Sequence, residues 1–94
     1  MRSRRRRSYR ERYDALEPRC REAADRQSDN WRNDPNHPSV CFKPIVGATE
    51  RGHQCYEARI NRRYRAACYR DTSGAENTYV WFWCGTHNEF DSRF

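Results

Sequence analysis

The sequence predicts a small, irregular α+β protein whose core depends on a metal ion or on disulfide bonds. The chain has 94 residues, of which 35% are hydrophobic and 34% are charged, so it cannot bury a large core. Much of the apolar material is aromatic, with three Trp, six Tyr and four Phe. A small cluster of rings needs help from a cross-link, a metal ion or a partner, and the five Cys and three His can supply it.

Residues 1–32 are predicted to form a basic, amphipathic helical arm. Apolar side chains recur there at steps of three, four or seven, as a helix requires, at Tyr9, Tyr13, Leu16, Cys20, Ala24 and Trp31. Pro18 interrupts the pattern, and proline is best tolerated in the first turn of a helix. We therefore expect a short basic helix before Glu17 and a second helix from about Pro18 to Asn30.

Residues 33–39 are predicted to be a linker, because two prolines stand there among Asn, Asp and Ser. A Cys/His-rich aromatic module follows at residues 40–94. Within it, residues 40–46 are expected to be extended, and Gly47 and Gly52 bracket a polar turn. An apolar repeat over residues 55–70 predicts a helix that also carries arginines. The β-branched and aromatic run at residues 78–83 predicts a strand, and the polar tail is expected to dock back through Phe90 and Phe94.

The cationic residues form two blocks, which points to an anionic partner. Residues 1–13 hold seven Arg and one acid, and residues 51–70 hold six Arg and one acid, while the other two stretches are acidic. Clustered cations favour nucleic acid or a nucleoprotein complex as the partner. The candidate contacts are Arg4, Arg5, Arg6, Arg7, Arg59, Arg62, Arg63 and Arg65. The alternative is a solvated tail and a solvated helix face whose arginines pair with nearby acids.

The spacing of Cys and His residues suggests a zinc site. Cys84 and His87 form a tight Cys-x-x-His pair, and a glycine-containing turn between Cys41 and Cys55 could bring those two together. Structural zinc sites usually combine one tight pair with ligands from elsewhere in the chain. Cys68 is the next candidate, and His53 follows it. Disulfide bonds or unligated thiols are the alternatives.

The pattern resembles a family of short Cys-Cys-Cys-His zinc-binding modules, found in chromatin-associated, fungal and phage proteins. The family pattern is C…T-x-x-G-x-x-C…C-x-x-H, and the matching residues here are Cys41, Thr49, Gly52, Cys55, Cys84 and His87. The resemblance covers about half of the chain. It implies that Cys41, Cys55, Cys84 and His87 bind Zn²⁺ and that the module binds nucleic acid.

The function expected from these observations is a non-enzymatic, zinc-stabilised nucleic-acid-binding module in the nucleus or on a nucleoid, with organelle import as an alternative. Glu50, Glu57 and Glu89 lie near candidate ligands, but none belongs to a catalytic motif such as His-Glu-x-x-His. Two alternatives remain: a structural subunit of a larger complex, and a disulfide-stapled secreted effector. No apolar run approaches the ~20 residues that span a bilayer.

Overall fold

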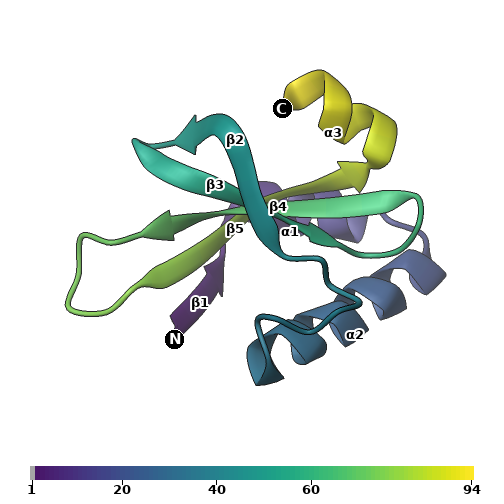
Figure 1. Cartoon of the computed structure of the whole chain (residues 1–94). Helices are drawn as coiled ribbons and strands as arrows, with labels where there is room; N and C mark the ends of the chain where they lie inside the picture. Colours follow the sequence, from purple (N-terminus) through teal and green to yellow (C-terminus); the bar gives the residue numbers. More distant parts are fainter. Residues whose placement is uncertain (1) are drawn as a thin grey trace.

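A computed structural model describes residues 2–94 and shows five strands and three helices (Figure 1). The prediction of an α+β protein is therefore confirmed. In chain order the elements are β1 (Arg2–Arg5), α1 (Arg7–Asp14), α2 (Pro18–Asn33), β2 (Lys43–Glu50), β3 (His53–Arg59), β4 (Tyr64–Asp71), β5 (Thr78–Thr86) and α3 (His87–Arg93). None of these helices is long and apolar enough to cross a membrane.

The strands form one mixed sheet in the order β1-β5-β4-β3-β2. Strands β2 to β5 follow one another as an antiparallel meander, and β1 pairs in parallel with β5 at the far edge. The β2–β3 connection is a two-residue turn in which Arg51 and Gly52 both have positive φ. Such turns match the twist of the flanking strands and hold them in fixed register.

The two faces of the sheet are covered by different helices (Figure 1). Side chains alternate along β5, so Tyr79 and Trp81 pack toward α2 while Val80 and Phe82 pack with Phe90 of α3. We call these the α1/α2 face and the α3 face. A register shift against β4 interrupts this alternation at Phe82, so Trp83 also packs on the α3 face and Cys84 lies on the α1/α2 face. Cys55 of β3 lies on the α3 face.

The helix predicted over residues 55–70 is wrong, because this segment forms the β3–β4 hairpin. Apolar residues at steps of three and four also fit two strands joined by a turn. The side-chain oxygen of Asn61 accepts hydrogen bonds from the amides of Arg63 and Tyr64, both at 2.9 Å, and this closes the turn. The second basic block therefore lies on a hairpin and not on a helix face.

The N-terminal helices agree with the sequence, since α1 ends at Asp14 and Pro18 opens α2. Tyr9, Leu16 and Ala24 pack with Ala66 and Cys84 of the sheet in one buried cluster. The strand β1 was not predicted, and neither was the helix α3, although Phe90 and Phe94 do dock back onto Trp83 as expected. The division into an arm, a linker and a module stays a prediction.

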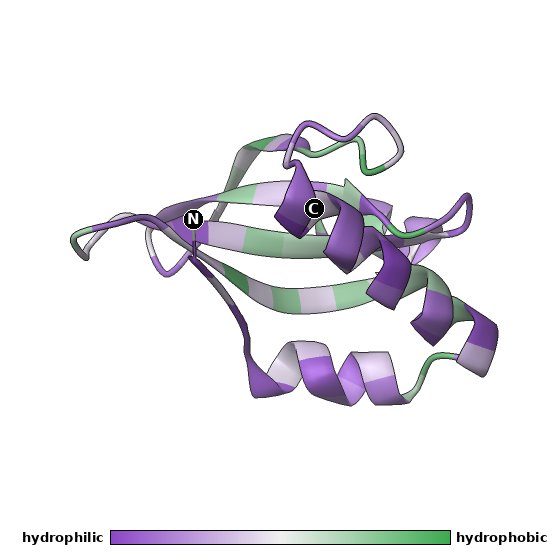
Figure 2. Ribbon diagram, turned by 90° about the horizontal axis from the view of Figure 1, so that it is seen from below, coloured by the Kyte–Doolittle hydropathy of each residue, from purple (hydrophilic) through white to green (hydrophobic). Residues whose placement is uncertain are grey.

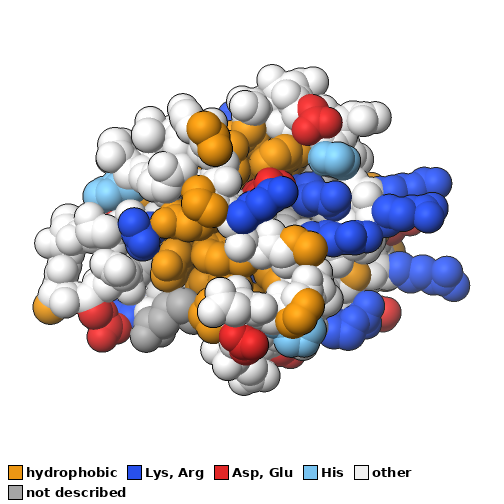
Figure 3. All heavy atoms as spheres, in the orientation of Figure 1, with side chains coloured by type: hydrophobic (Ala, Val, Ile, Leu, Met, Phe, Trp, Pro, Cys, Tyr) orange, Lys and Arg blue, Asp and Glu red, His pale blue; other side chains and the backbone are white. Residues whose placement is uncertain are grey.

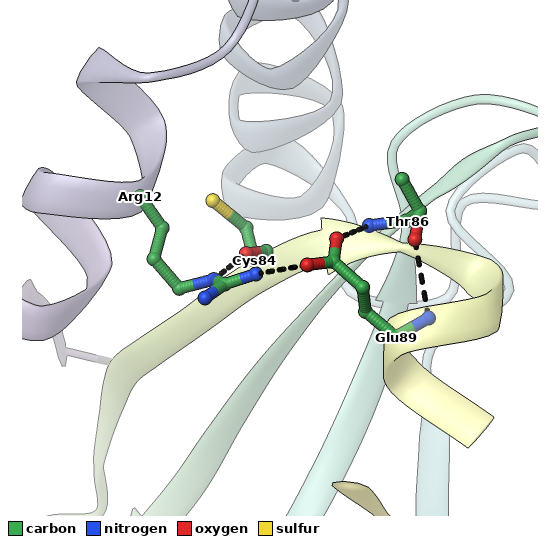
Figure 4. Close-up of polar contacts among 4 residues, drawn as sticks. All are labelled: Arg12, Cys84, Thr86 and Glu89. Atoms are coloured by element: carbon green, nitrogen blue, oxygen red, sulfur yellow. Dashed lines mark hydrogen bonds and ion pairs between the residues drawn. The ribbon is translucent and has the colours of Figure 1, made fainter. Parts of the chain in front are cut away.

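Arg12 joins α1, β5 and α3 at one point (Figure 4). Its Nε donates to the Cys84 carbonyl oxygen, its Nη2 lies 3.0 Å from Glu89 Oε2, and its guanidinium lies 4.9 Å from the centre of the Trp83 ring. Glu89 also accepts from the Thr86 amide, while the Thr86 hydroxyl accepts from the Glu89 amide. This reciprocal cap begins α3 and fixes the helix over its face of the sheet.

Candidate nucleic-acid-binding and catalytic site

The residues predicted to bind zinc are dispersed. Cys55 and Cys84 lie on opposite faces of the sheet, Cys41 is exposed in the loop before β2, and His87 begins α3 with Nε2 3.6 Å from Asp91 Oδ1. Residues 2–94 contain no group of three or more His, Cys, Asp or Glu that could hold a metal ion. The resemblance to Cys-Cys-Cys-His modules is therefore wrong, and Zn²⁺ stays a prediction without a site in this part of the chain.

Three of the thiols are buried in the core. All five cysteines are free, so the structure gives no support to a disulfide-stapled effector. Burial raises the pKa of Cys55 to about 11 and that of Cys84 to about 12. Burial also raises the pKa of Cys68 well above its usual value. Since metals and electrophiles react with the thiolate, these neutral, buried thiols act as small core side chains.

Four of the predicted nucleic-acid contacts gather around the β3–β4 turn. Arg59 and Arg65 are directly opposite each other in register on the α3 face, and Arg62 and Arg63 are exposed in the turn. Figure 3 shows Lys and Arg side chains concentrated on the right of that view, where Figure 1 places this turn and the start of α2. Like charges opposite each other destabilise a sheet, so their presence favours an anionic ligand.

The four N-terminal arginines are placed differently from one another. Arg4 pairs in register with Val80 and belongs to the α3 face. Arg5 is on the other face, where its guanidinium lies 5.3 Å from the Tyr9 ring and Nη2 donates to Ser28 at 3.4 Å. Arg6 reaches Glu50, with Nη1 and Oε2 3.2 Å apart, and Arg7 is exposed at the start of α1.

Glu50 and His53 form a cross-strand pair next to the β2–β3 turn. They are register partners, so their side chains project from the same face at the close separation of directly opposed residues. Arg6 pairs with the Glu50 carboxylate, and Nε2 of His53 lies 3.6 Å from Asp71 Oδ1. Both partners of each pair are partly shielded, with exposed side-chain fractions of 25–29%.

The imidazole of His53 is held in one orientation by two neighbours. Its ring stacks on Tyr69 with centroids 5.7 Å apart and planes 10° apart, and Asp71 faces its Nε2. Hydrogen bonds from the Ser73 hydroxyl and amide lower the pKa of the Asp71 carboxyl, and His53 and Arg4 lower it further. Asp71 is therefore ionised at neutral pH, and its carboxylate fixes the position of the His53 ring.

The end of α3 completes the polar surroundings of this pair. Arg93 lies 5.8 Å from the Phe82 ring and 5.3 Å from the Phe94 ring. The Phe82 ring packs against Tyr69 with centroids 5.9 Å apart, and Tyr69 stacks on His53, so these rings link Arg93 to the pair. A carboxylate, an oriented imidazole and several arginines on one face can transfer protons and stabilise a phosphate.

Sequence reasoning named His53 only as a reserve metal ligand and did not single out Tyr69, Asp71 or Arg93. These residues lie on three different elements, and only the fold brings them together. One local feature could have indicated the pair, because Glu50-Arg51-Gly52-His53 has the turn glycine of a two-residue hairpin. That turn sets a carboxylate and an imidazole opposite each other.

The structure therefore defines an α+β fold with a single sheet. Helices α1 and α2 cover one face, and the α3 face carries arginines together with the Glu50–His53 pair. A solved structure with a similar fold is described as the YoeB/ParE toxin from Agrobacterium tumefaciens. The TM-score is 0.67 at 19% sequence identity, over 93% of this chain and 99% of the other. No family model and no curated protein matches the sequence.

This similarity corrects the function expected from the sequence. The chain shares its fold with a protein described as a toxin, and residues 2–94 hold no metal-binding group, so the expected zinc-stabilised DNA-binding module and its nuclear location are not supported. The similarity concerns the fold alone, so the expectation of a non-enzymatic protein stays a prediction.

Proposed function

We propose that this protein is a toxin of the YoeB/ParE type that binds RNA along the α3 face and cleaves its backbone with Glu50 and His53. The observation that carries the proposal is the cross-strand Glu50–His53 pair, braced by Arg6 and Asp71, on the same face as the Arg59–Arg65 pair. The toxin fold supports the biological role, and the face supplies the chemistry.

RNA is the substrate that these groups suit. Its 2′-hydroxyl is an internal nucleophile, which DNA lacks. Glu50 is placed to accept the proton of that hydroxyl while O2′ attacks the adjacent phosphorus. The P–O5′ bond breaks, and protonated His53 gives its proton to the leaving O5′. The products are a 2′,3′-cyclic phosphate and a free 5′-hydroxyl, so one proton enters and one leaves the enzyme.

The arginines have two separate roles in this proposal. Arg6 pairs with Glu50, and Arg93 lies over the Phe82 ring on the same face, and a guanidinium there stabilises charge that develops on the phosphate oxygens. Arg59, Arg62, Arg63 and Arg65 lie at the other end of β3 and β4, where they hold the flanking backbone. Arg4 adds a further cation at the β1 edge of the same face.

The test is cleavage of a labelled single-stranded RNA of 20 nucleotides by the purified protein. We expect products that end in 2′,3′-cyclic phosphate. Glu50→Gln and His53→Asn should each lower the single-turnover rate by about 100-fold or more. Arg59→Gln combined with Arg65→Gln should instead weaken RNA binding and reduce its salt dependence by about 0.7 per lost contact in the logarithmic slope.

Two matched variants control for general damage. Glu76→Gln changes an exposed carboxylate in the β4–β5 loop, and His87→Asn changes an exposed imidazole at the start of α3. Both should cleave at the wild-type rate. Expression in a bacterial host should arrest growth for the wild type and for these controls, but not for Glu50→Gln. RNA that binds and is never cleaved, or equal rates in all variants, would refute the catalytic assignment.

A further inference from the structure

Part of the α1/α2 face is not covered by a helix. Seen from below in Figure 2, the ends of the strands nearest the β4–β5 loop extend beyond α1 and α2. Phe42, Tyr56, Arg70 and Tyr79 lie here and are each half-buried, and we call these four residues the aromatic platform. The strand register confirms that they share a face. Tyr79 is directly opposite Arg70, and Tyr56 is directly opposite Cys68, which in turn is opposite Trp81 of the same face.

The rings of the platform pack against one another and leave their hydroxyl groups free. Phe42 and Tyr56 stack with centroids 5.1 Å apart and planes 10° apart, and Tyr79 stands edgewise at 5.7 and 5.8 Å from these rings. Trp31 of α2 closes the cluster from the inner side. Within residues 2–94 neither tyrosine hydroxyl has a hydrogen-bond partner. Neither is buried, so both hydroxyls are accessible to solvent.

Arg70 is the one charge of the platform, and it is unpaired. Its guanidinium lies 5.5 Å from the Tyr56 ring, on the outer side of the Phe42–Tyr56 stack. Across the described chain it makes no ion pair, and its Nε is a buried donor without an acceptor. A buried donor of this kind is normally satisfied, and because the Nε is enclosed, a docking carboxylate would meet the terminal nitrogens of the guanidinium.

The strand positions next to the platform on the same face hold no carboxylate in residues 2–94. Neighbouring positions on the same face are Ser3, Gln54 and Pro44. Because side chains alternate along the strands, Glu50, Glu57 and Asp71 lie on the opposite, α3 face. The platform is therefore an apolar surface with two free hydroxyls and one positive charge.

We propose that the aromatic platform docks a partner polypeptide that brings apolar side chains to the rings and a carboxylate to Arg70. Tyr, Trp and Arg dominate the binding energy of protein interfaces, and charge complementarity selects an acidic partner. Nucleobases fit less well, because they stack on free ring faces. Here the face of Tyr56 is already occupied by Phe42 and by Arg70. The surface is on the opposite face from Glu50 and His53, so it does not depend on the proposed nuclease activity.

The test selects peptides from a phage-displayed library of random 12-residue sequences on the immobilised wild-type protein. We expect enriched sequences in which Asp or Glu stands beside large apolar residues. The most enriched peptide is then synthesised with a fluorescent label. Arg70→Gln should weaken its binding by about tenfold, and Tyr79→Ala should do the same. The matched control Arg10→Gln, an exposed arginine on α1, should bind within twofold of the wild type.

Folding is checked separately, because Tyr79→Ala removes a ring from a packed cluster. Tyr56→Phe removes only a hydroxyl and should lower peptide affinity while leaving the thermal midpoint unchanged. Three results overturn the proposal: no acidic sequence is enriched, the peptide binds Arg70→Gln as well as the wild type, or a single-stranded RNA of ten nucleotides loses as much affinity as the peptide in the platform variants. The last result would identify the platform as a nucleic-acid surface.

Discussion

Gly85→Ala should destabilise the protein strongly, although it adds only a methyl group. A Cβ at this position would lie 2.7 Å from Arg12 Nη2, 2.8 Å from Trp83 Cζ2 and 2.9 Å from Glu89 Oε1. Each of these atoms is held by the others, because Arg12 packs on Trp83 and pairs with Glu89. Arg12 and Glu89 can move, because they meet the new atom with the ends of part-exposed side chains, but moving them breaks their contacts with each other and with the buried Trp83 ring.

The magnitude follows from the contacts that would be lost. Overpacking a buried position costs about 1–3 kcal/mol. Displacement of Glu89 also weakens the reciprocal cap with Thr86, which contributes about 1 kcal/mol. The Arg12–Glu89 pair adds less than about 1 kcal/mol, because both side chains are exposed by 39% or more. We therefore expect a loss of about 2–4 kcal/mol in the free energy of unfolding.

The assay is urea unfolding followed by tryptophan fluorescence, in which Trp83 is a local reporter. For a domain of this size a loss of about 3 kcal/mol corresponds to a fall of about 12–24 °C in Tm. Gly74→Ala is the matched control, because a Cβ there would meet only the Glu76 carbonyl oxygen at an ordinary 3.7 Å. A loss below about 0.5 kcal/mol in Gly85→Ala, or equal losses in both variants, would refute the reasoning.

Two further predictions concern pH. Hydrogen bonds from the Thr86 amide and hydroxyl, followed by Arg12, lower the pKa of Glu89, so its contribution is present at neutral pH and is lost as the pH falls below about 4. Wild type should therefore lose more stability than Glu89→Gln between pH 7 and pH 3 in urea titrations, and equal losses would contradict this. Burial raises the pKa of Cys84 from 9.0 to about 12, so its stabilising effect is complete below pH 9 and declines between pH 9 and 12 as the unfolded thiol ionises first. The thermal midpoint of Cys84→Ala should fall less than that of wild type between pH 8 and pH 10.5, and parallel curves would argue against a buried, neutral thiol.

Local chemistry allowed part of this structure to be predicted from the sequence. Pro18 begins α2, since the first turn of a helix does not need the amide proton that proline lacks. The run of β-branched and aromatic residues at 78–83 forms the first part of β5. The thin, ring-rich core also follows from composition. These features depend on residues that are close together in the sequence, so the sequence is enough to predict them.

The apolar repeat over residues 55–70 could not be assigned in the same way. Tyr56, Ile60 and Tyr64 fit a helical period, yet they also fit two strands around the Asn61 turn. The segment forms two strands and not a helix because β3 pairs with β2 and β4 pairs with β5. The β4–β5 pairing in particular joins residues that are far apart in the sequence. The turn then set Arg59 opposite Arg65, which no helix would do.

The sequence by itself determined the residue types that could act: thiols, imidazoles and two blocks of arginine. The tertiary structure decided which of them meet. In a sheet, side chains alternate between faces, and the register shift in β5 moves Cys84 to the face opposite Cys55, so the two cannot share an ion. The same alternation places Glu50 and His53 on one face, with Arg6 and Asp71 in contact. Which face a side chain occupies depends on strand pairing, and strand pairing is not a local property of the chain.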